Sequence, residues 1–264
     1  MTAILETQGL SRTFNGFHAV SGVSLSVRQG HIHALIGPNG AGKTTCFNLL
    51  TRFIDATAGT IRYDGQDITR TPADAVARRG LVRSFQISAV FGKLSVFENV
   101  RLAVQRSRGH SMDWWRSDRA LQVHDARTRE LLDEAGLSEW AGHLAGELPY
   151  GRKRALELAT TLALEPRVIL LDEPMAGMGA EDIAGAAQMI RRAARGRTVL
   201  MVEHNLSVVA NLCDRITVLA RGEVLAEGDY ATVSRDPRVV EAYLGHGHAG
   251  QRKHSKHTTA GAAP

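Results

Sequence analysis

The stretch Gly37-Pro38-Asn39-Gly40-Ala41-Gly42-Lys43-Thr44 organises the rest of this 264-residue chain. It matches the pattern G-x-x-x-x-G-K-[ST] at every fixed position, between an apolar run at 31–36 and a helical pattern at 43–53. Glycines let the backbone wrap around an anion, and the N-terminus of the following helix adds positive potential. We therefore expect a phosphate-binding loop, in which Lys43 neutralises the β- and γ-phosphates of a nucleotide and the Thr44 hydroxyl binds Mg²⁺.

Two carboxylates follow the most hydrophobic segment of the chain, residues 168–171. Four apolar residues in a row indicate a buried central strand, and open α/β sheets bind their ligands at the carboxyl ends of such strands. Asp172 is therefore placed to hold Mg²⁺, and Glu173 to polarise an attacking water as general base. An acidic pair after a strand is by itself a common surface feature. Together with a phosphate loop, it indicates nucleotide hydrolysis.

Two further polar residues end predicted strands. Gln86 follows the apolar segment 81–85, and His204 follows the segment 198–203. Because the carboxyl ends of parallel strands meet at one edge of a sheet, both side chains are expected to reach the bound phosphates. Gln86 could bind the metal and report the presence of the γ-phosphate to the helical segment that follows, and His204 could contact the γ-phosphate.

Short apolar strands alternate with helical patterns along most of the chain, which is typical of an α/β fold with a largely parallel sheet covered on both faces. Between about 90 and 160 the apolar residues recur at helical spacing, which indicates an inserted helical subdomain. Residues 246–264 are rich in His, Gly, Ala and Thr and hold basic but no acidic residues. This composition predicts a disordered basic, histidine-rich tail.

The charge balance and composition limit the class of protein. There are 32 Lys and Arg against 27 Asp and Glu, a net charge of +5, and the tail supplies Arg252, Lys253 and Lys256. The nearly neutral remainder argues against nucleic acid as the main partner. No run reaches the roughly 18 apolar residues of a membrane span, and no secretory signal stands at the N-terminus. Two cysteines do not make a disulfide framework. We expect a soluble, cytosolic chain.

Four further segments follow the phosphate loop along the chain. They are Arg83-Ser-Phe-Gln86, Leu148-Pro-Tyr-Gly-Arg-Lys-Arg154, Leu170-Leu-Asp-Glu-Pro174 and Glu203-His204. In this order and spacing, residues 5–245 resemble the ATP-binding subunits of ABC transporters. Within that family, Met201-Val-Glu-His-Asn205 and the ending Val239-Val-Glu-Ala-Tyr-Leu-Gly245 are similar to the first ATPase of high-affinity branched-chain amino acid importers.

The resemblance implies one ABC ATPase domain over residues 4–245, with a P-loop NTPase core, a mostly parallel sheet, an N-terminal antiparallel β region and the helical insertion. It implies ATP and Mg²⁺ as cofactors. The catalytic residues would be Glu173, His204 and Gln86, and the metal ligands Thr44, Gln86 and Asp172. The nucleotide-binding residues would be Phe14, Gly37, Pro38, Asn39, Gly40, Ala41, Gly42, Lys43, Thr44 and Thr45. Phe14 stands where the family stacks an aromatic ring on adenine, and a phenylalanine of the core is the alternative.

Partners are also implied by the resemblance. Two ATP-binding subunits would sandwich the nucleotides beneath integral membrane permease subunits, as peripheral proteins on the cytoplasmic face of the inner or plasma membrane. A substrate-binding protein would take part indirectly, and nucleic acid would not. The solute would be a branched-chain amino acid or a related small amino-acid or amide compound. In the sandwich, the signature loop of each subunit completes the ATP site of the other. That loop is here Pro149, Tyr150, Gly151 and Arg152.

Two residues depart from the family pattern. Pro149 replaces the usual signature serine and offers neither a hydroxyl nor an N–H group. Gly179 stands where the family usually carries Asp or Asn, and it has no side chain. Both residues would serve the partner's site, so we hypothesise an asymmetric heterodimer with a different ATPase. A homodimer stays possible, and so does a signature loop whose backbone amides suffice.

Two other functions are weighed against the transporter hypothesis. A soluble ABC-type ATPase acting on nucleic acid or ribosomes would usually carry two ATPase units or a long coiled coil, whereas this chain has one phosphate loop and no sustained heptads. A small-molecule kinase or a GTPase would leave Gln86, the signature segment and His204 unexplained, and the guanine-specifying run Asn-Lys-x-Asp is absent.

Overall fold

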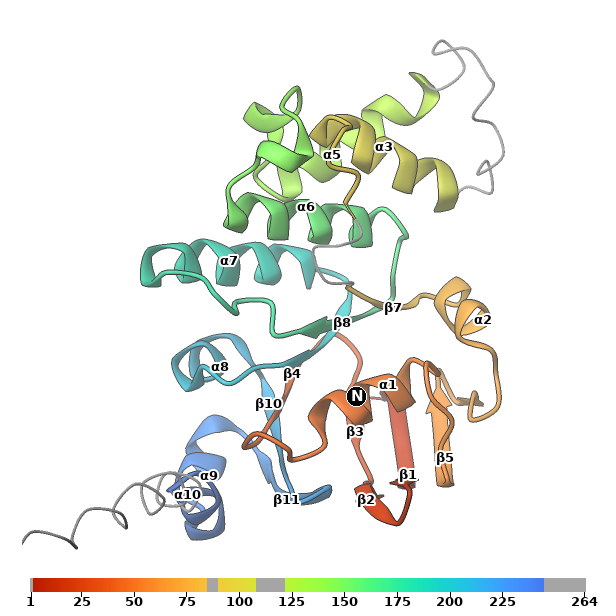
Figure 1. Ribbon diagram of the computed structural model, residues 1–264, viewed down its shortest axis with the longest axis vertical. Coiled ribbons are helices and arrows are strands. Elements are labelled where there is room, and N and C mark those ends of the chain that lie inside the picture. Colours follow the sequence, from red (N-terminus) through yellow and green to blue (C-terminus); the bar gives the residue numbers. More distant parts are fainter. Residues whose placement is uncertain (1, 85–89, 108–121, 245–264) are drawn as a thin grey trace, which may run out of the picture.

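The computed structural model describes residues 2–84, 90–107 and 122–244 (Figure 1). Within these residues, six strands form the central sheet in the order β11-β10-β4-β9-β8-β7, and β11 alone runs antiparallel to its neighbour. The strands are β4 (Ile32–Ile36), β7 (Leu81–Arg83), β8 (Val168–Asp172), β9 (Thr198–Val202), β10 (Arg215–Ala220) and β11 (Glu223–Gly228). Every residue of β4 and β9 is buried, as expected for central parallel strands covered on both faces.

A second, antiparallel sheet comes from the N-terminal part of the chain. It joins β2-β1-β5-β6, with β3 also paired to β1. Its strands are β1 (Ala3–Phe14), β2 (Phe17–Gly22), β3 (Ser26–Arg28), β5 (Ala58–Tyr63) and β6 (Gln66–Asp67). Asn15 and Gly16 connect β1 to β2 with φ angles of 45° and 85°, the positive values that a tight two-residue hairpin needs. The predicted N-terminal antiparallel region is thereby confirmed.

Helices follow most strands of the central sheet. They are α1 (Lys43–Leu50), α2 (Ala73–Arg78), α3 (Val96–Ser107), α5 (Asp125–Glu134), α6 (Tyr150–Leu162), α7 (Ala180–Ala193), α8 (Leu206–Leu212), α9 (Tyr230–Ser234) and α10 (Pro237–Leu244). Short 3₁₀ turns occur at Gln122–His124, Ser138–Trp140 and Ala145–Glu147. Between β7 and β8 the chain makes α3, α5 and α6, which gather together at one end of the molecule (Figure 1). The structure thus has the helical insertion that the sequence predicts.

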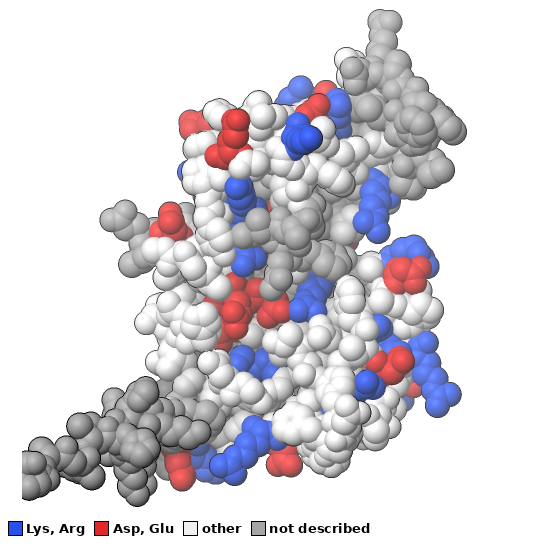
Figure 2. Space-filling model, in the orientation of Figure 1, with Lys and Arg blue, Asp and Glu red and all other residues white. Residues whose placement is uncertain are grey.

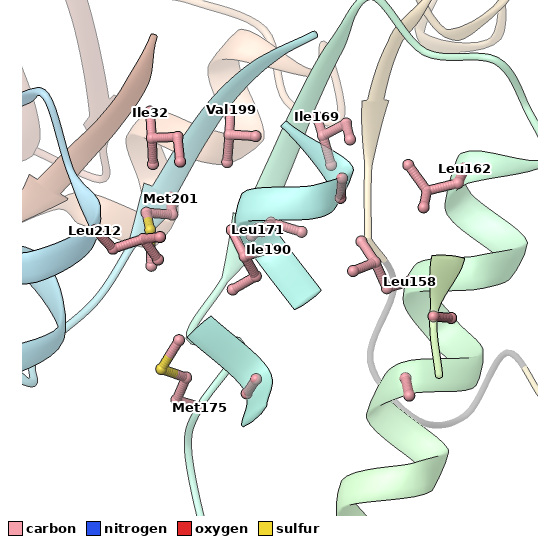
Figure 3. Packing of buried hydrophobic residues seen from close by; sticks show 14 of the residues in the cluster. Ile32, Leu158, Leu162, Ile169, Leu171, Met175, Ile190, Val199, Met201 and Leu212 are labelled. Atoms are coloured by element: carbon pink, nitrogen blue, oxygen red, sulfur yellow. The ribbon is translucent and has the colours of Figure 1, made fainter. Parts of the chain in front are cut away.

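The central sheet separates two hydrophobic clusters. Successive residues of a strand point to opposite faces, so Leu170 belongs to the cluster shared with α1 and the antiparallel sheet, whereas Ile169 and Leu171 belong to the cluster shared with the helices of the insertion. Figure 3 shows the second cluster, in which Ile190 of α7 packs near Leu171. The sheet is therefore packed on both faces, and the loops at the ends of its strands are attached to a close-packed core.

The boundaries of several elements differ from those predicted. The helix expected over 43–53 ends at Leu50, because Arg52 takes a left-handed conformation with φ 62°. Strand β1 runs as far as Phe14 through irregular pairing with β2 between Gly9 and Arg12. In the described residues, none of the helices has the length and apolar character needed to cross a bilayer.

Candidate functional site

The phosphate loop connects β4 to α1 and requires glycine at two positions. Gly37 has φ 151°, and a Cβ atom there would lie 2.1 Å from the carbonyl oxygen of Leu219. Gly42, the residue before α1, has φ 97°, and its Cβ would lie 2.4 Å from the carbonyl oxygen of Ala19. A Cβ atom cannot be accommodated at either distance, so only glycine allows the loop to pass this close to the backbones of β10 and β2.

Lys43 closes this loop. Its side chain is buried, and its ammonium group donates to the carbonyl oxygens of Gly37 at 2.7 Å and Pro38 at 3.0 Å. Burial lowers the pKa of the Lys43 ammonium, while the carboxylates of Glu173 and Asp172 act in the opposite direction. The fold thus brings the cation of the phosphate loop within electrostatic reach of both predicted acids, although they are far apart in the sequence.

Asp172 ends β8 and already has a cationic partner. Arg83, at the end of the neighbouring strand β7, donates from Nη2 to Asp172 Oδ2 at 2.5 Å and from Nη1 to Asn48 Oδ1 at 2.5 Å. Both side chains of the ion pair are largely buried. Nothing in the sequence around Arg83 predicts this role. The parallel register of β7 and β8, which sets the two side chains beside each other, appears only in the folded chain.

Glu173 lies in the turn after β8 and has a left-handed backbone with φ 46°. Its N–H donates to the carbonyl of Val202 at 3.0 Å, and its own carbonyl accepts from Ala176 at 3.0 Å. His204 follows β9, and its side chain is exposed at the same edge of the sheet. Gln86, the third predicted catalytic residue, lies outside the described residues.

Phe14 stands at the end of β1 with 40% of its surface exposed, and the guanidinium of Arg12 lies 4.5 Å from the centre of its ring. The alternative that Phe14 belongs to the hydrophobic core is therefore wrong. With Arg12 against it and part of its surface open, the ring is available for stacking on a base. That Phe14 binds adenine stays a prediction.

The residues present fit ATP and Mg²⁺. A Cβ added at Gly40 would meet no atom within 4 Å, so the outer side of the loop is open, and Asn39 and Thr44 are exposed there. The hydroxyl of Thr44 and the carboxylate of Asp172 are oxygen donors, which Mg²⁺ prefers. Thr45, one residue further along α1, is half-buried. Figure 2 shows acidic and basic side chains side by side at the middle of one face of the molecule.

The predicted signature residues begin helix α6. Pro149 is the residue before its first turn, so the amides of Tyr150, Gly151 and Arg152 stand at a helix N-terminus. The hydroxyl of Tyr150 donates to the carbonyl of Ala176 at 2.8 Å. The four signature residues, together with Gly177, Met178 and Asp182, line one hollow of about 420 Å³. The signature segment and the segment around Gly179 therefore form one continuous surface.

Comparison with known proteins shows the family. A model described as "ABC transporter" matches residues 20–176, more than half of the chain. This chain belongs to the ABC transporter ATPase family. In this ABC ATPase a second model, described as "Branched-chain amino acid ATP-binding cassette transporter", matches residues 223–249. Hydrolysis of ATP coupled to transport is the activity of the family, and the fold predicted for such a subunit is confirmed by the structure.

Relatives cover nearly the whole ABC ATPase. It is 38% identical over 252 residues to the high-affinity branched-chain amino acid transport ATP-binding protein BraF of Pseudomonas aeruginosa, covering 92% of this chain and 98% of that protein. It is 32% identical over 244 residues to the lipopolysaccharide export system ATP-binding protein LptB of Escherichia coli, with the same coverage. The crystal structure of the ADP conformation of an ATP-binding cassette has a TM-score of 0.77 and 30% identity, covering 93% of this chain and 100% of that one.

Proposed function

We propose that this chain is the ATP-hydrolysing subunit of an importer for branched-chain amino acids or a related small amino-acid or amide solute. The observation that carries the proposal is the 38% identity to BraF of Pseudomonas aeruginosa, which extends over 98% of that protein. The match of residues 223–249 to the branched-chain amino acid cassette family supports the same solute class. The lipopolysaccharide export relative is less similar, at 32% identity.

The site residues take the following roles in this proposal. The phosphate loop and Lys43 hold the phosphates, and Phe14 stacks on adenine. Thr44 and Asp172 hold Mg²⁺, with Gln86 as a further ligand, and the ion neutralises phosphate charge when bound. Glu173 polarises the attacking water, and His204 contacts the γ-phosphate. Because Asp172 is paired with Arg83, we expect the guanidinium to release part of this carboxylate when Mg²⁺ binds.

A permease would dock between the central sheet and the helical insertion. A hollow of about 260 Å³ lies there, lined by residues of β7, α3 and α6. At this hollow Phe91 is 62% exposed and Leu102 is 41% exposed. Exposed aromatic and aliphatic side chains beside Arg106 have the composition of a protein interface. Binding there would hold the chain at the cytoplasmic face of the membrane as a peripheral subunit.

The second ATP-binding subunit is proposed to be a different chain. Pro149 and Gly179 lie on the surface that this chain would present to its partner, and neither supplies a side-chain hydrogen bond to phosphate. The residues that serve its own site, among them Lys43, Asp172 and Glu173, are all present. A partner with a serine in its signature would then complete one competent site, and the other site would be weaker.

Mass spectrometry of the proteins that co-purify with the tagged chain from gently solubilised membranes tests this proposal. We expect a polytopic permease and a second ATPase, and uptake of labelled leucine by the reconstituted complex. Recovery of a permease without uptake of leucine, valine, isoleucine or amides would overturn the solute class alone. Recovery of ribosomes or nucleic acid without any membrane protein would overturn the importer and favour the soluble ABC-type ATPase.

A further inference from the structure

Glu203 is a carboxylate with no exposed surface, directly after β9 and directly before His204. A fully buried carboxylate is costly unless hydrogen bonds satisfy its oxygens. Here the two oxygens accept from three backbone N–H groups that belong to two different loops. In the sequence Glu203 stands only as the residue before His204, with nothing to predict these contacts.

One oxygen of Glu203 holds the loop after β8. Oε1 accepts from the N–H of Met175 at 3.2 Å. Met175 lies two residues after Glu173, and Pro174 between them has no N–H to contribute. The N–H of Glu173 itself donates to Val202, the residue before Glu203. The left-handed turn at Glu173 is therefore fastened on both sides to the end of β9.

The other oxygen holds the loop after β9. Oε2 accepts from the N–H of His204 at 3.0 Å and from the N–H of Asn205 at 3.2 Å. Asn205 in turn caps helix α8, since its side chain accepts from Ser207 and Val208. The backbone that carries His204 is thus fixed between the carboxylate of Glu203 and the start of α8.

We propose that Glu203 is a positioning residue that sets the loop of Glu173 against the loop of His204. A single rigid carboxylate ties both loops, so a displacement of one is transmitted to the other. The carboxylate form suits this task because all its lone pairs accept, and charge-assisted bonds to N–H groups are stronger than neutral ones. This inference rests on the proposed roles of Glu173 and His204 in ATP hydrolysis.

The Glu203→Gln variant tests the proposal in the complex that co-purifies with the full chain. Glutamine has the same shape, but its NH₂ group faces N–H groups on one side and cannot accept from them. We expect kcat for ATP to fall by about tenfold to a hundredfold, with an unchanged ATP affinity. Glu203→Asp keeps the charge on a shorter side chain and is expected to lie between the wild type and Glu203→Gln in kcat. It also serves as the test if Glu203→Gln fails to fold.

Hydrogen exchange of the full chain separates positioning from general stability. We expect faster exchange in Glu203→Gln at the amides of Met175, His204 and Asn205, and unchanged exchange in β4 and β8. Asp214→Asn is the matched control, because the Asp214 carboxylate also accepts from a backbone N–H, that of Ile32 at 2.8 Å, but at the opposite edge of the sheet. It should leave both kcat and the exchange of the two loops unchanged.

Two outcomes would overturn the proposal. One is an unchanged kcat in Glu203→Gln while Glu173→Gln abolishes turnover, which would leave the proposed function intact. The other is faster exchange spread over the whole central sheet, which would make Glu203 a residue of general stability. If Glu173→Gln keeps full turnover, the proposed role of Glu173 fails, and the exchange of the two loops still decides whether Glu203 joins them.

Discussion

Glu173 illustrates how much a single backbone conformation contributes to the site. Non-glycine residues with positive φ are uncommon, and they persist where the surrounding structure holds them. At Glu173 the hydrogen bonds to Val202 and from Ala176 hold a φ of 46°. In this turn the Glu173 carboxylate lies within electrostatic reach of Lys43, whose pKa it acts to raise.

Replacement of Glu173 by glutamine is expected to separate ATP binding from hydrolysis. Loss of a general base lowers the rate by about 10²- to 10⁴-fold. Steady-state turnover of ATP should therefore fall by at least about a hundredfold. Binding of ATP should persist, because the phosphate loop is unchanged. The measurement is phosphate release together with nucleotide binding. Glu139→Gln, at an exposed position of the helical insertion, is the control. Full turnover in Glu173→Gln would show that another group activates the water.

His33 makes stability depend on pH. This histidine is fully buried in β4, and its Nε2 forms a hydrogen bond of 2.8 Å with Thr217 Oγ1. Burial, aided by Arg215 and His31, lowers the pKa of His33 from 6.5 to about 3. Between these two values the unfolded chain binds a proton that the folded chain does not, so stability falls as the pH falls from about 6.5 towards 3.

Removing His33 should remove this pH dependence. Each pH unit in the window contributes up to about 1.4 kcal/mol to the free energy of unfolding. We expect the double variant His33→Val/Thr217→Val, which leaves no unpaired hydroxyl, to lose this part of the slope in urea unfolding between pH 4 and 6. Thr217→Val alone keeps the histidine and should keep the slope. Equal slopes in all three proteins would assign the acid sensitivity to other groups.

Helix α6 begins with an unusual residue for its task. Proline suits the entrance of a helix because its fixed φ matches the backbone there, −56° at Pro149. It leaves the amides of the first turn free, but it supplies no hydroxyl. The hydrogen bond of Tyr150 to Ala176 fixes this helix end to the loop after β8. The N-terminus of α6 is thus held in place by Tyr150, but it lacks the hydroxyl that a serine at position 149 would offer to a phosphate group.

Pro149→Ser is expected to raise the ATP turnover of the assembled complex. A charge-assisted hydrogen bond to phosphate is worth about 1.5–3 kcal/mol, which corresponds to roughly tenfold to a hundredfold in the rate of one site. Pro149→Ala removes the ring without adding a hydroxyl and should leave turnover near that of the wild type. An equal turnover in the serine and alanine variants would contradict the asymmetric dimer and favour the view that backbone amides suffice.

The assembly as a whole presents two surfaces with different tasks. The surface of Pro149, Tyr150 and Gly179 would face a second ATPase, and the hollow with Phe91 and Leu102 would face the membrane partner. The first surface lies between the helical insertion and α7 with the loop after β8, and the hollow lies between the insertion and β7. Helix α6 contributes to both surfaces, so a movement of the insertion would change both at once.

Phe91→Glu should detach the chain from its permease without affecting ATP binding. A charge in place of a 62% exposed aromatic ring adds a desolvation cost to the docked state only. The measurement is the yield of the membrane protein that co-purifies with the tagged variant. Val240→Glu, a similar change at a 44% exposed position of α10, is the control. An undiminished yield in Phe91→Glu would place the docking surface elsewhere.

Local patterns were sufficient for the phosphate loop and for the buried strand at 168–171. The spacing of Gly37, Gly42 and Lys43 predicts a loop between a strand and a helix, because few other residues fit such backbone angles. The run 168–171 predicts a buried strand followed by its carboxylates, and the structure has β8 there. These features depend on residues that are neighbours in the chain, so the sequence contains all the information that they need.

Contacts between distant segments could be found only in the folded chain. Arg83 meets Asp172 because β7 and β8 are adjacent and in register, and Glu203 meets Met175 because β9 lies next to β8. The exposure of Phe14 and the bond of Tyr150 to Ala176 likewise depend on packing between segments. The sequence alone specified which chemical groups the protein carries and the loops on which they stand. The tertiary structure specified which of them meet, because strand order and burial arise from the whole core at once.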